Sequence, residues 1–185
     1  MTRVCLIGND DCTLQYELLS RETSREALAT YDLTRPFENS LSVRTVSVGA
    51  AVSLLNDLQW YLIRFVDEAL VLEPSISDDE WLSRALAREL RNGDVEPDET
   101  AEFCKIYGLE RVDAASETGD SEDGADGEGD TRDADDPNGS ATAAYASHRL
   151  VEPLYVRRTG GELPAYDLRD VDETLVVRVT EDEYT

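Results

Sequence analysis

The chain has 185 residues, of which 41 are Asp or Glu and 17 are Lys or Arg, so its formal net charge at pH 7 is −24. A chain this acidic repels phosphate backbones and anionic lipid, which disfavours duplex DNA and membrane surfaces as partners. At this length we expect one domain with a proper core rather than two large ones.

The cations are unusual in kind. Sixteen of them are Arg, and Lys105 is the single lysine. An acidic chain with almost no lysine is typical of proteins adapted to molar salt, where the Debye length is only about 3 Å and surface carboxylates repel one another weakly. A nucleic-acid binder in molar salt cannot depend on counterion release and can itself be acidic, so nucleic acid is disfavoured as a partner without being excluded.

Cysteine content and apolar runs indicate the compartment. The three cysteines are an odd count without metal-ligand spacing, which favours a reducing cytoplasm and predicts neither disulfides nor a zinc site. The four-residue apolar run near the start is too short for a signal-peptide core, and no segment approaches the roughly 20 apolar residues of a membrane span. We therefore predict a cytoplasmic protein without a membrane anchor or a cofactor.

Composition divides the chain into three parts. Residues 113–140 carry eleven acids and one Arg, with no aromatic or large aliphatic side chain. Such a stretch cannot bury enough apolar surface to order itself, which predicts a disordered linker or insertion. We expect an α+β core over residues 1–112 and a β-rich segment over residues 141–185 that completes the same domain.

Hydrophobic periodicity predicts the elements of the first part. A strand is expected at residues 4–7, with a turn at residues 8–11. Strands are also expected at residues 41–47 and 69–72. The predicted helices cover residues 12–30, 52–66, 78–92 and 98–107. Ser77 and Glu80 form a capping-box pattern before the third helix, and Gly93 is placed to end it.

The predicted helix over residues 52–66 is apolar around most of its circumference. Trp60, Tyr61 and Ile63 widen the apolar face beyond the usual stripe. Such a helix is either central to the core or used in self-association. We therefore name these three residues as candidate interaction residues, although aromatics at helical spacing are more often core.

The segment after the linker is extended in pattern. Strands are predicted at residues 150–151, 154–156 and 174–180, with a turn at residues 159–162. A β-hairpin region of this size is marginal alone, so we expect it to pair with the sheet of the first part or with another chain.

The predicted element order favours a ferredoxin-like α+β sandwich. The runs VRTVSV (residues 43–48), LLNDLQWYLIRF (54–65) and LVLEP (70–74) make residues 43–90 resemble the C-terminal extension of WYL-domain transcriptional regulators. That resemblance implies a role in oligomerisation or effector response. The family's glycine before the last strand is missing here, and so is a winged-helix DNA reader. The whole chain also resembles an uncharacterised protein family of halophilic archaea.

Candidate sites are few. Asp10, Asp11 and Glu73 follow predicted strands and could together hold a divalent cation, although helix capping explains the two aspartates equally well. Arg157 and Arg158 are the only adjacent cation pair, which points to anion or carboxylate binding, or to pairing with surface carboxylates.

No catalytic constellation is predicted. The lone histidine, His148, beside the linker cannot build a multi-histidine metal site, and Cys12 lies next to two acids that oppose a thiolate. We therefore favour a non-enzymatic interaction or regulatory module that self-associates or binds a protein partner. The alternatives are a metal- or small-molecule-binding enzyme that uses Asp10, Asp11 and Glu73, and a DNA-associated regulator that uses the arginine pair.

Overall fold

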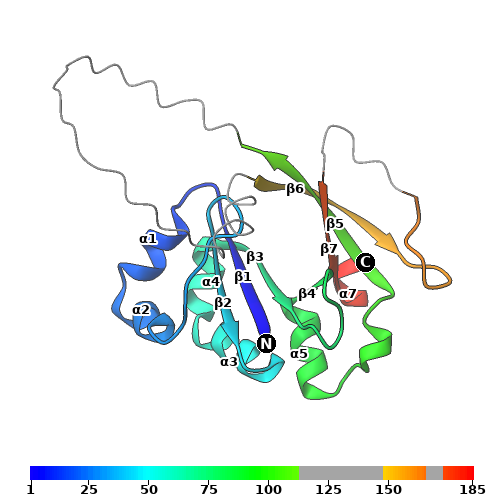
Figure 1. Ribbon diagram of the computed structural model, residues 1–185, viewed down its shortest axis with the longest axis horizontal. Helices are drawn as coiled ribbons and strands as arrows, with labels where there is room; N and C mark the ends of the chain where they lie inside the picture. Colours follow the sequence, from blue (N-terminus) through cyan, green and yellow to red (C-terminus); the bar gives the residue numbers. More distant parts are fainter. Residues whose placement is uncertain (113–147, 166–172) are drawn as a thin grey trace, which may run out of the picture.

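The computed structural model describes residues 1–112, 148–165 and 173–185. The predicted acidic linker, residues 113–140, lies outside these ranges, as do the first residues of the predicted β-rich segment. The described residues combine helices and strands in one structure, which confirms the α+β class (Figure 1). The division of the chain into three parts stays a prediction.

The elements alternate between strands and helices in the first half and are mainly strands in the second. In chain order they are β1 (Thr2–Gly8), α1 (Leu14–Leu19), α2 (Glu22–Leu28), β2 (Ser40–Thr45), α3 (Val48–Asp57), α4 (Gln59–Phe65), β3 (Val66–Leu72), β4 (Trp81–Ser83), α5 (Arg84–Asn92), the 3₁₀ helix η1 (Pro97–Glu99), β5 (Phe103–Arg111), β6 (His148–Arg157), β7 (Glu173–Arg178) and α7 (Glu181–Tyr184).

The strands form one seven-stranded mixed sheet in the order β2-β1-β3-β4-β7-β5-β6. Only the contact between β4 and β7 is parallel. Because β2 and β3 both run antiparallel to β1, they are parallel to each other with β1 between them, and α3 and α4 make the crossover. This split βαβ unit is one component of a ferredoxin-like fold. The complete ferredoxin-like arrangement is not confirmed, because β7 joins the sheet beside β4 and parallel to it.

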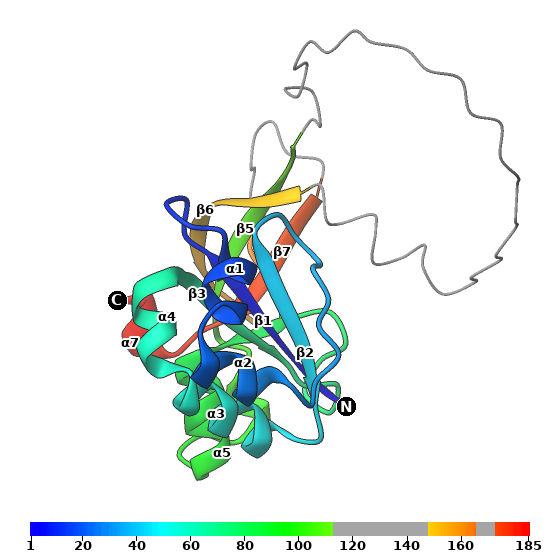
Figure 2. The same cartoon turned by 90° about the vertical axis from the view of Figure 1, so that its left-hand side faces the viewer.

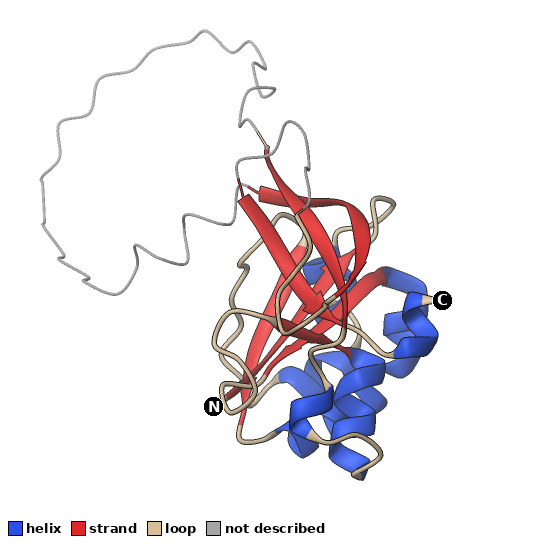
Figure 3. Ribbon diagram, turned by 90° about the vertical axis from the view of Figure 1, so that its right-hand side faces the viewer, coloured by secondary structure: helices blue, strands red, loops and turns tan. Residues whose placement is uncertain are grey.

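Strand β1 is buried on both faces, which explains its unbroken apolar run. Val4 and Leu6 face the helices α1–α5, whereas Cys5 and Ile7 face a second core formed with β5 and β7. This alternation follows the two-residue period of a strand. Helices α1–α5 therefore lie on the first of these faces, whereas Tyr184 of α7 packs against the second core (Figures 2 and 3).

Two predicted helices are each broken into two. The helix expected at residues 12–30 is α1 and α2, because Ser24 donates a hydrogen bond to the carbonyl of Leu18 and the backbone turns at Arg21. The helix expected at residues 52–66 is α3 and α4, which meet at Leu58 with φ −91° and ψ 5°. Leu58 itself is buried, so the core contact outweighs the continuous helical pattern.

The third predicted helix begins later than expected. The Ser77 hydroxyl accepts the backbone N–H of Glu80, but it caps a turn rather than a helix. Residues 81–83 form β4 because they pair with β3 and β7. Helix α5 begins with Ser83 as its N-cap and ends at Gly93 in the left-handed conformation, φ +78°, which confirms the predicted end.

The helix expected at residues 98–107 is wrong. Only η1 is helical there, and β5 takes over from Phe103 because it pairs with β6 on one side and β7 on the other. The predicted strands at residues 150–151 and 154–156 are one strand, β6, which tolerates Pro153 because it lies at the edge of the sheet. Gly160 and Gly161, both with positive φ, form the predicted turn. None of the helices in the described residues has the length and apolar character needed to cross a membrane.

Candidate interaction surface

Helix α4 turns two large apolar side chains away from the core. Trp60 is 48% exposed and Ile63 is 74% exposed, one helical turn apart on the same face. Tyr61, which we predicted with them, is instead buried with Leu62 on the opposite face. The break at Leu58 sets this orientation, so α4 covers the core with one face and presents Trp60 and Ile63 with the other.

Trp60 is held between two arginines. The guanidinium carbon of Arg64 lies 4.2 Å from the centroid of the Trp60 ring, and that of Arg21 lies 5.6 Å from it. Arg21 also lies over the ring of Phe65 at 5.2 Å and forms an ion pair with Glu17. Each exposed cation–π contact stabilises by about 0.5–1 kcal/mol. These contacts with its own chain therefore restrict the position of the indole.

The turn after β1 fixes the end of α4. The backbone N–H of Asn9 donates to the carbonyl of Phe65 at 2.9 Å, and its side-chain amide donates to the carbonyl of Arg64 at 3.0 Å. The same turn is held by Asn39, whose amide nitrogen donates to the carbonyls of Asn9 and Cys12, and whose amide oxygen accepts the N–H of Leu14. The turn after β1 and the segment before β2 therefore meet at the C-terminal end of α4.

Asn39 is a structural residue that the sequence analysis missed. Its φ of +48° is the only positive value among non-glycine residues of the described chain. Asn tolerates this conformation better than most residues, and it is common in turns. An Asn directly before a predicted strand was the available signal, but its three partners lie far away in sequence.

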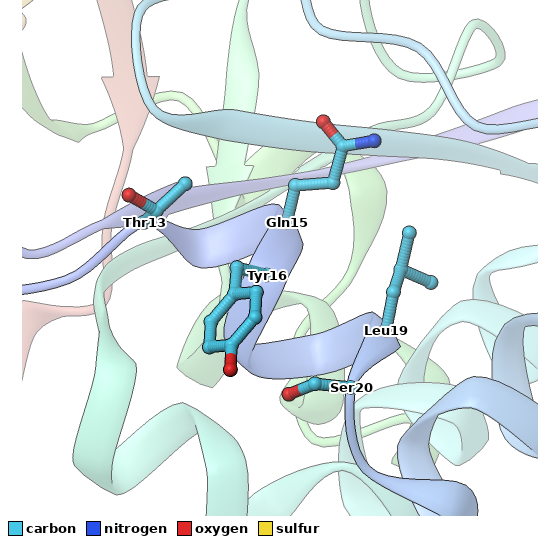
Figure 4. Close-up of a pocket in the computed structure, with 5 residues that line it drawn as sticks. All are labelled: Thr13, Gln15, Tyr16, Leu19 and Ser20. Atoms are coloured by element: carbon cyan, nitrogen blue, oxygen red, sulfur yellow. The ribbon is translucent and has the colours of Figure 1, made fainter.

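Helix α1, which packs against α4, carries a further exposed ring. Tyr16 is 67% exposed and borders an open hollow of about 470 Å³ together with Thr13, Gln15, Leu19 and Ser20 (Figure 4). Figure 4 shows the Tyr16 and Leu19 side chains leaving α1 in different directions, and Leu19 is partly buried against the core. Exposed apolar side chains therefore occur on both of these neighbouring helices.

The predicted metal ligands do not converge. Glu73 lies beside the first residue of β1, where it accepts a hydrogen bond from the hydroxyl of Thr2, whereas Asp10 and Asp11 follow the last residue of β1. A seven-residue strand spans roughly 20 Å, so no single cation can bind all three. Within residues 1–112, 148–165 and 173–185, no group of three or more His, Cys, Asp or Glu side chains could hold a metal ion.

The charge of Glu73 is satisfied by its neighbours. Burial raises the pKa of this carboxyl, but hydrogen bonds from Thr2 and Ser75 outweigh that effect and hold the pKa below its ordinary value. Glu73 therefore behaves as an anchor between β3 and β1. This role accounts for it without a bound cation.

The two adjacent arginines have different roles. Arg157 forms an exposed ion pair with Glu102, and its guanidinium lies 5.5 Å from the ring centroid of Phe103. Arg158 forms a part-buried ion pair with Glu80, which also binds Arg178. Both cations are neutralised by carboxylates of the chain, so they do not form the open cationic patch that nucleic-acid binding requires.

The cysteines have the character of structural residues. Burial raises the pKa of Cys5 to about 12, and burial followed by the charge of Glu17 also raises the pKa of Cys12. Burial raises the pKa of Cys104 as well. A raised pKa opposes the thiolate that a nucleophilic cysteine needs. His148 begins β6, and its carbonyl accepts the N–H of Glu38 at 2.7 Å.

Residues 2–109 match a family described as a family of unknown function (DUF5804). The chain belongs to this family. The matched segment runs from β1 into β5 and so contains α1, α4 and the surface around Trp60. No curated protein and no solved structure shows a significant match to the chain.

Proposed function

We propose that this chain is a non-enzymatic interaction module, with a regulatory role, that acts through self-association or a protein partner. The observation that carries the proposal is the exposed indole of Trp60 held between Arg21 and Arg64. Trp, Tyr and Arg are the residues most enriched where single side chains dominate binding energy. A ring already fixed by its neighbours loses little conformational entropy when a partner covers it.

The position of Ile63 supports the same proposal. Ile63 is 74% exposed and lies beside the half-exposed Trp60. Burial of its side chain would supply about 1–2 kcal/mol of hydrophobic free energy. A partner that covers both side chains recovers this free energy. The surface belongs to residues 43–90, the segment that resembles the C-terminal extension of WYL-domain regulators, and that resemblance also favours oligomerisation.

We further propose that the protein works in molar salt in the cytoplasm of a halophilic archaeon. The net charge of −24, the single lysine and the three free cysteines support this setting. Molar salt screens the repulsion between two acidic copies, so apolar contacts can bring them together. Association experiments therefore belong in molar KCl.

Substitution of the exposed residues is expected to weaken association. Trp60→Ala removes a hot-spot indole, for which a loss of about 2 kcal/mol corresponds to a roughly 30-fold higher dissociation constant. Ile63→Asp places a charge in the same contact and is expected to abolish it. Light scattering over a concentration series in molar KCl measures self-association. A pull-down with the tagged chain, after nuclease treatment of the lysate, detects binding to a different protein.

Val46→Asp provides the matched control. Val46 is 79% exposed, close to the 74% of Ile63, but it follows β2 and lies outside α1 and α4. The control is expected to associate like the unsubstituted chain. The proposal is contradicted if the chain is monomeric at every concentration and the pull-down also finds no protein whose binding depends on Ile63. Equal losses in Val46→Asp and Ile63→Asp would also contradict it.

A further inference from the structure

A small cavity lies in the helical layer, away from the residues discussed so far. It has a volume of about 140 Å³ and lies where the end of α3 and the start of α4 meet α5. Helices α3 and α5 pack side by side, as Figure 2 shows. The lining residues are Val52, Asn56, Gln59, Arg84 and Arg88. The cavity is therefore polar and contains two cations.

Arg84 is held in place by one of its two terminal nitrogens. Its Nη2 donates to Oδ1 of Asn56 at 3.3 Å, to Oε1 of Gln59 at 3.1 Å and to the carbonyl of Leu55 at 3.5 Å. The guanidinium carries five N–H donors in a fixed plane. Nε and Nη1 of Arg84 have no acceptor in the part of the chain that the structure describes.

The side-chain nitrogens of this cavity keep N–H donors that have no acceptor among the described residues. Because the amide oxygens of Asn56 and Gln59 accept from Arg84, their NH₂ groups remain to face a ligand. Arg88 adds five further donors and makes no hydrogen bond to any described residue. A group that offers only acceptors, such as an oxyanion, satisfies a site of this kind.

The positive charge of the cavity also favours an anionic ligand. Arg84 and Arg88 are one helical turn apart on α5, a spacing at which like charges repel. Among the residues described, no carboxylate lies within ion-pair distance of either one, whereas the part-buried Arg158 and Arg178 both pair with Glu80. Burial, and then the charge of Arg88, lower the pKa of Arg84, as expected of a cation without a counter-ion.

We propose that this cavity binds a doubly charged oxyanion of the phosphate type. Two guanidiniums match the charge of a dianion, and their planar forks bond to its oxygens in pairs. The amides of Asn56 and Gln59 complete the donor set. The ion joins α3, α4 and α5 and removes the repulsion between the arginines. This site does not depend on the interaction surface around Trp60.

Inorganic phosphate is the probe for this site. A ligand that binds only the folded chain raises the unfolding midpoint by mass action. We expect the midpoint, followed by circular dichroism in KCl buffers of fixed ionic strength, to rise and saturate as phosphate replaces chloride. Arg88→Ala is expected to raise the half-saturating concentration at least about tenfold, since one charge-assisted contact is lost. Arg88 is exposed, so its truncation leaves the core intact.

Two further variants make the result specific. Asn56→Asp keeps the shape of the side chain but places a carboxylate beside Arg84, and it is expected to abolish the phosphate effect in a folded chain. Arg25→Ala removes an exposed arginine of α2 outside the cavity and is expected to respond like the unsubstituted chain. Acetate is expected to stabilise less than phosphate.

The proposal fails if phosphate does not shift the midpoint. It also fails if Arg88→Ala and Asn56→Asp respond to phosphate like the unsubstituted chain, because the shift is then a general salt effect. Equal stabilisation by acetate would overturn the assignment to a dianion. These outcomes leave the association experiment with Trp60 and Ile63 unaffected, so the two proposals are tested separately.

Discussion

Glu80→Ala is expected to destabilise the folded chain by about 3–5 kcal/mol, the usual cost of removing one partner from a buried ion pair. Both carboxylate oxygens of Glu80 are engaged, one by Arg158 and the other by Arg178. The three side chains are only 11–17% exposed. Removal of the carboxylate leaves two guanidinium charges confined near the parallel contact of β4 and β7. Urea unfolding in molar KCl measures the loss.

Glu102→Ala is the matched control for this prediction. Glu102 also pairs with an arginine, Arg157, but both side chains are about half exposed. Exposed pairs typically contribute no more than about 1 kcal/mol. A loss in Glu102→Ala as large as that in Glu80→Ala would show that burial does not decide the effect.

The Glu80 network also makes stability depend on pH. Burial raises the pKa of Glu80, but hydrogen bonds from Arg158 and Arg178, together with their charges, outweigh it and hold the pKa below the ordinary 4.5. A carboxyl with a lowered pKa in the folded state contributes its stability fully above the unfolded value and loses it as the pH falls below about 4.5. Glu80→Gln, which cannot ionise, is expected to lose less stability over that range than the unsubstituted chain.

Lys105→Met is expected to cost about 3 kcal/mol, since it leaves the Glu68 carboxylate with little water and no cation. Lys105 is the single lysine of the chain, and its side chain is only 8% exposed. Its ammonium contacts the Glu68 carboxylate, which also accepts the hydroxyl hydrogen of Tyr107. These contacts join β3 to β5, which are not neighbours in the sheet.

The rescue experiment separates the charge from the packing. Replacing the whole network with apolar side chains, as Lys105→Met with Glu68→Met and Tyr107→Phe, leaves no buried polar group without a partner. Apolar replacements of buried ion pairs are often neutral or stabilising. We expect the triple variant to recover most of the unfolding free energy lost by Lys105→Met. A triple variant less stable than Lys105→Met would contradict this account, and so would a single variant as stable as the unsubstituted chain.

Much of the first half of the fold is readable from local patterns. The run from Val4 to Ile7 predicted β1, the residues around Val43 predicted β2, and Gly93 predicted the end of α5. In each case the strand or cap is determined within a few residues. The helix break at Leu58 was missed because both helices keep the same apolar spacing, and only packing against the core favours a turn there.

The residues of α4 also show what local patterns predict and what they do not. The wide apolar face predicted Trp60, Tyr61 and Ile63 as interaction residues; the structure leaves Trp60 and Ile63 exposed and buries Tyr61, and the interaction itself stays a prediction. Helical spacing says which residues share a face. It does not say how far a neighbouring element covers that face.

Contacts between residues far apart in the sequence decided the elements that local patterns predicted wrongly. Residues 81–83 and 103–107 look helical by local pattern and are strands because β3, β6 and β7 supply hydrogen-bonding partners. Arg84 and Arg88 resemble any solvated helix face until Asn56 and Gln59, about 30 positions earlier, meet them across a cavity. By itself the sequence determined an acidic α+β protein with an unusually apolar helical segment, because composition and periodicity are local. The tertiary structure decided which polar groups meet, because burial and pairing depend on distant parts of the chain.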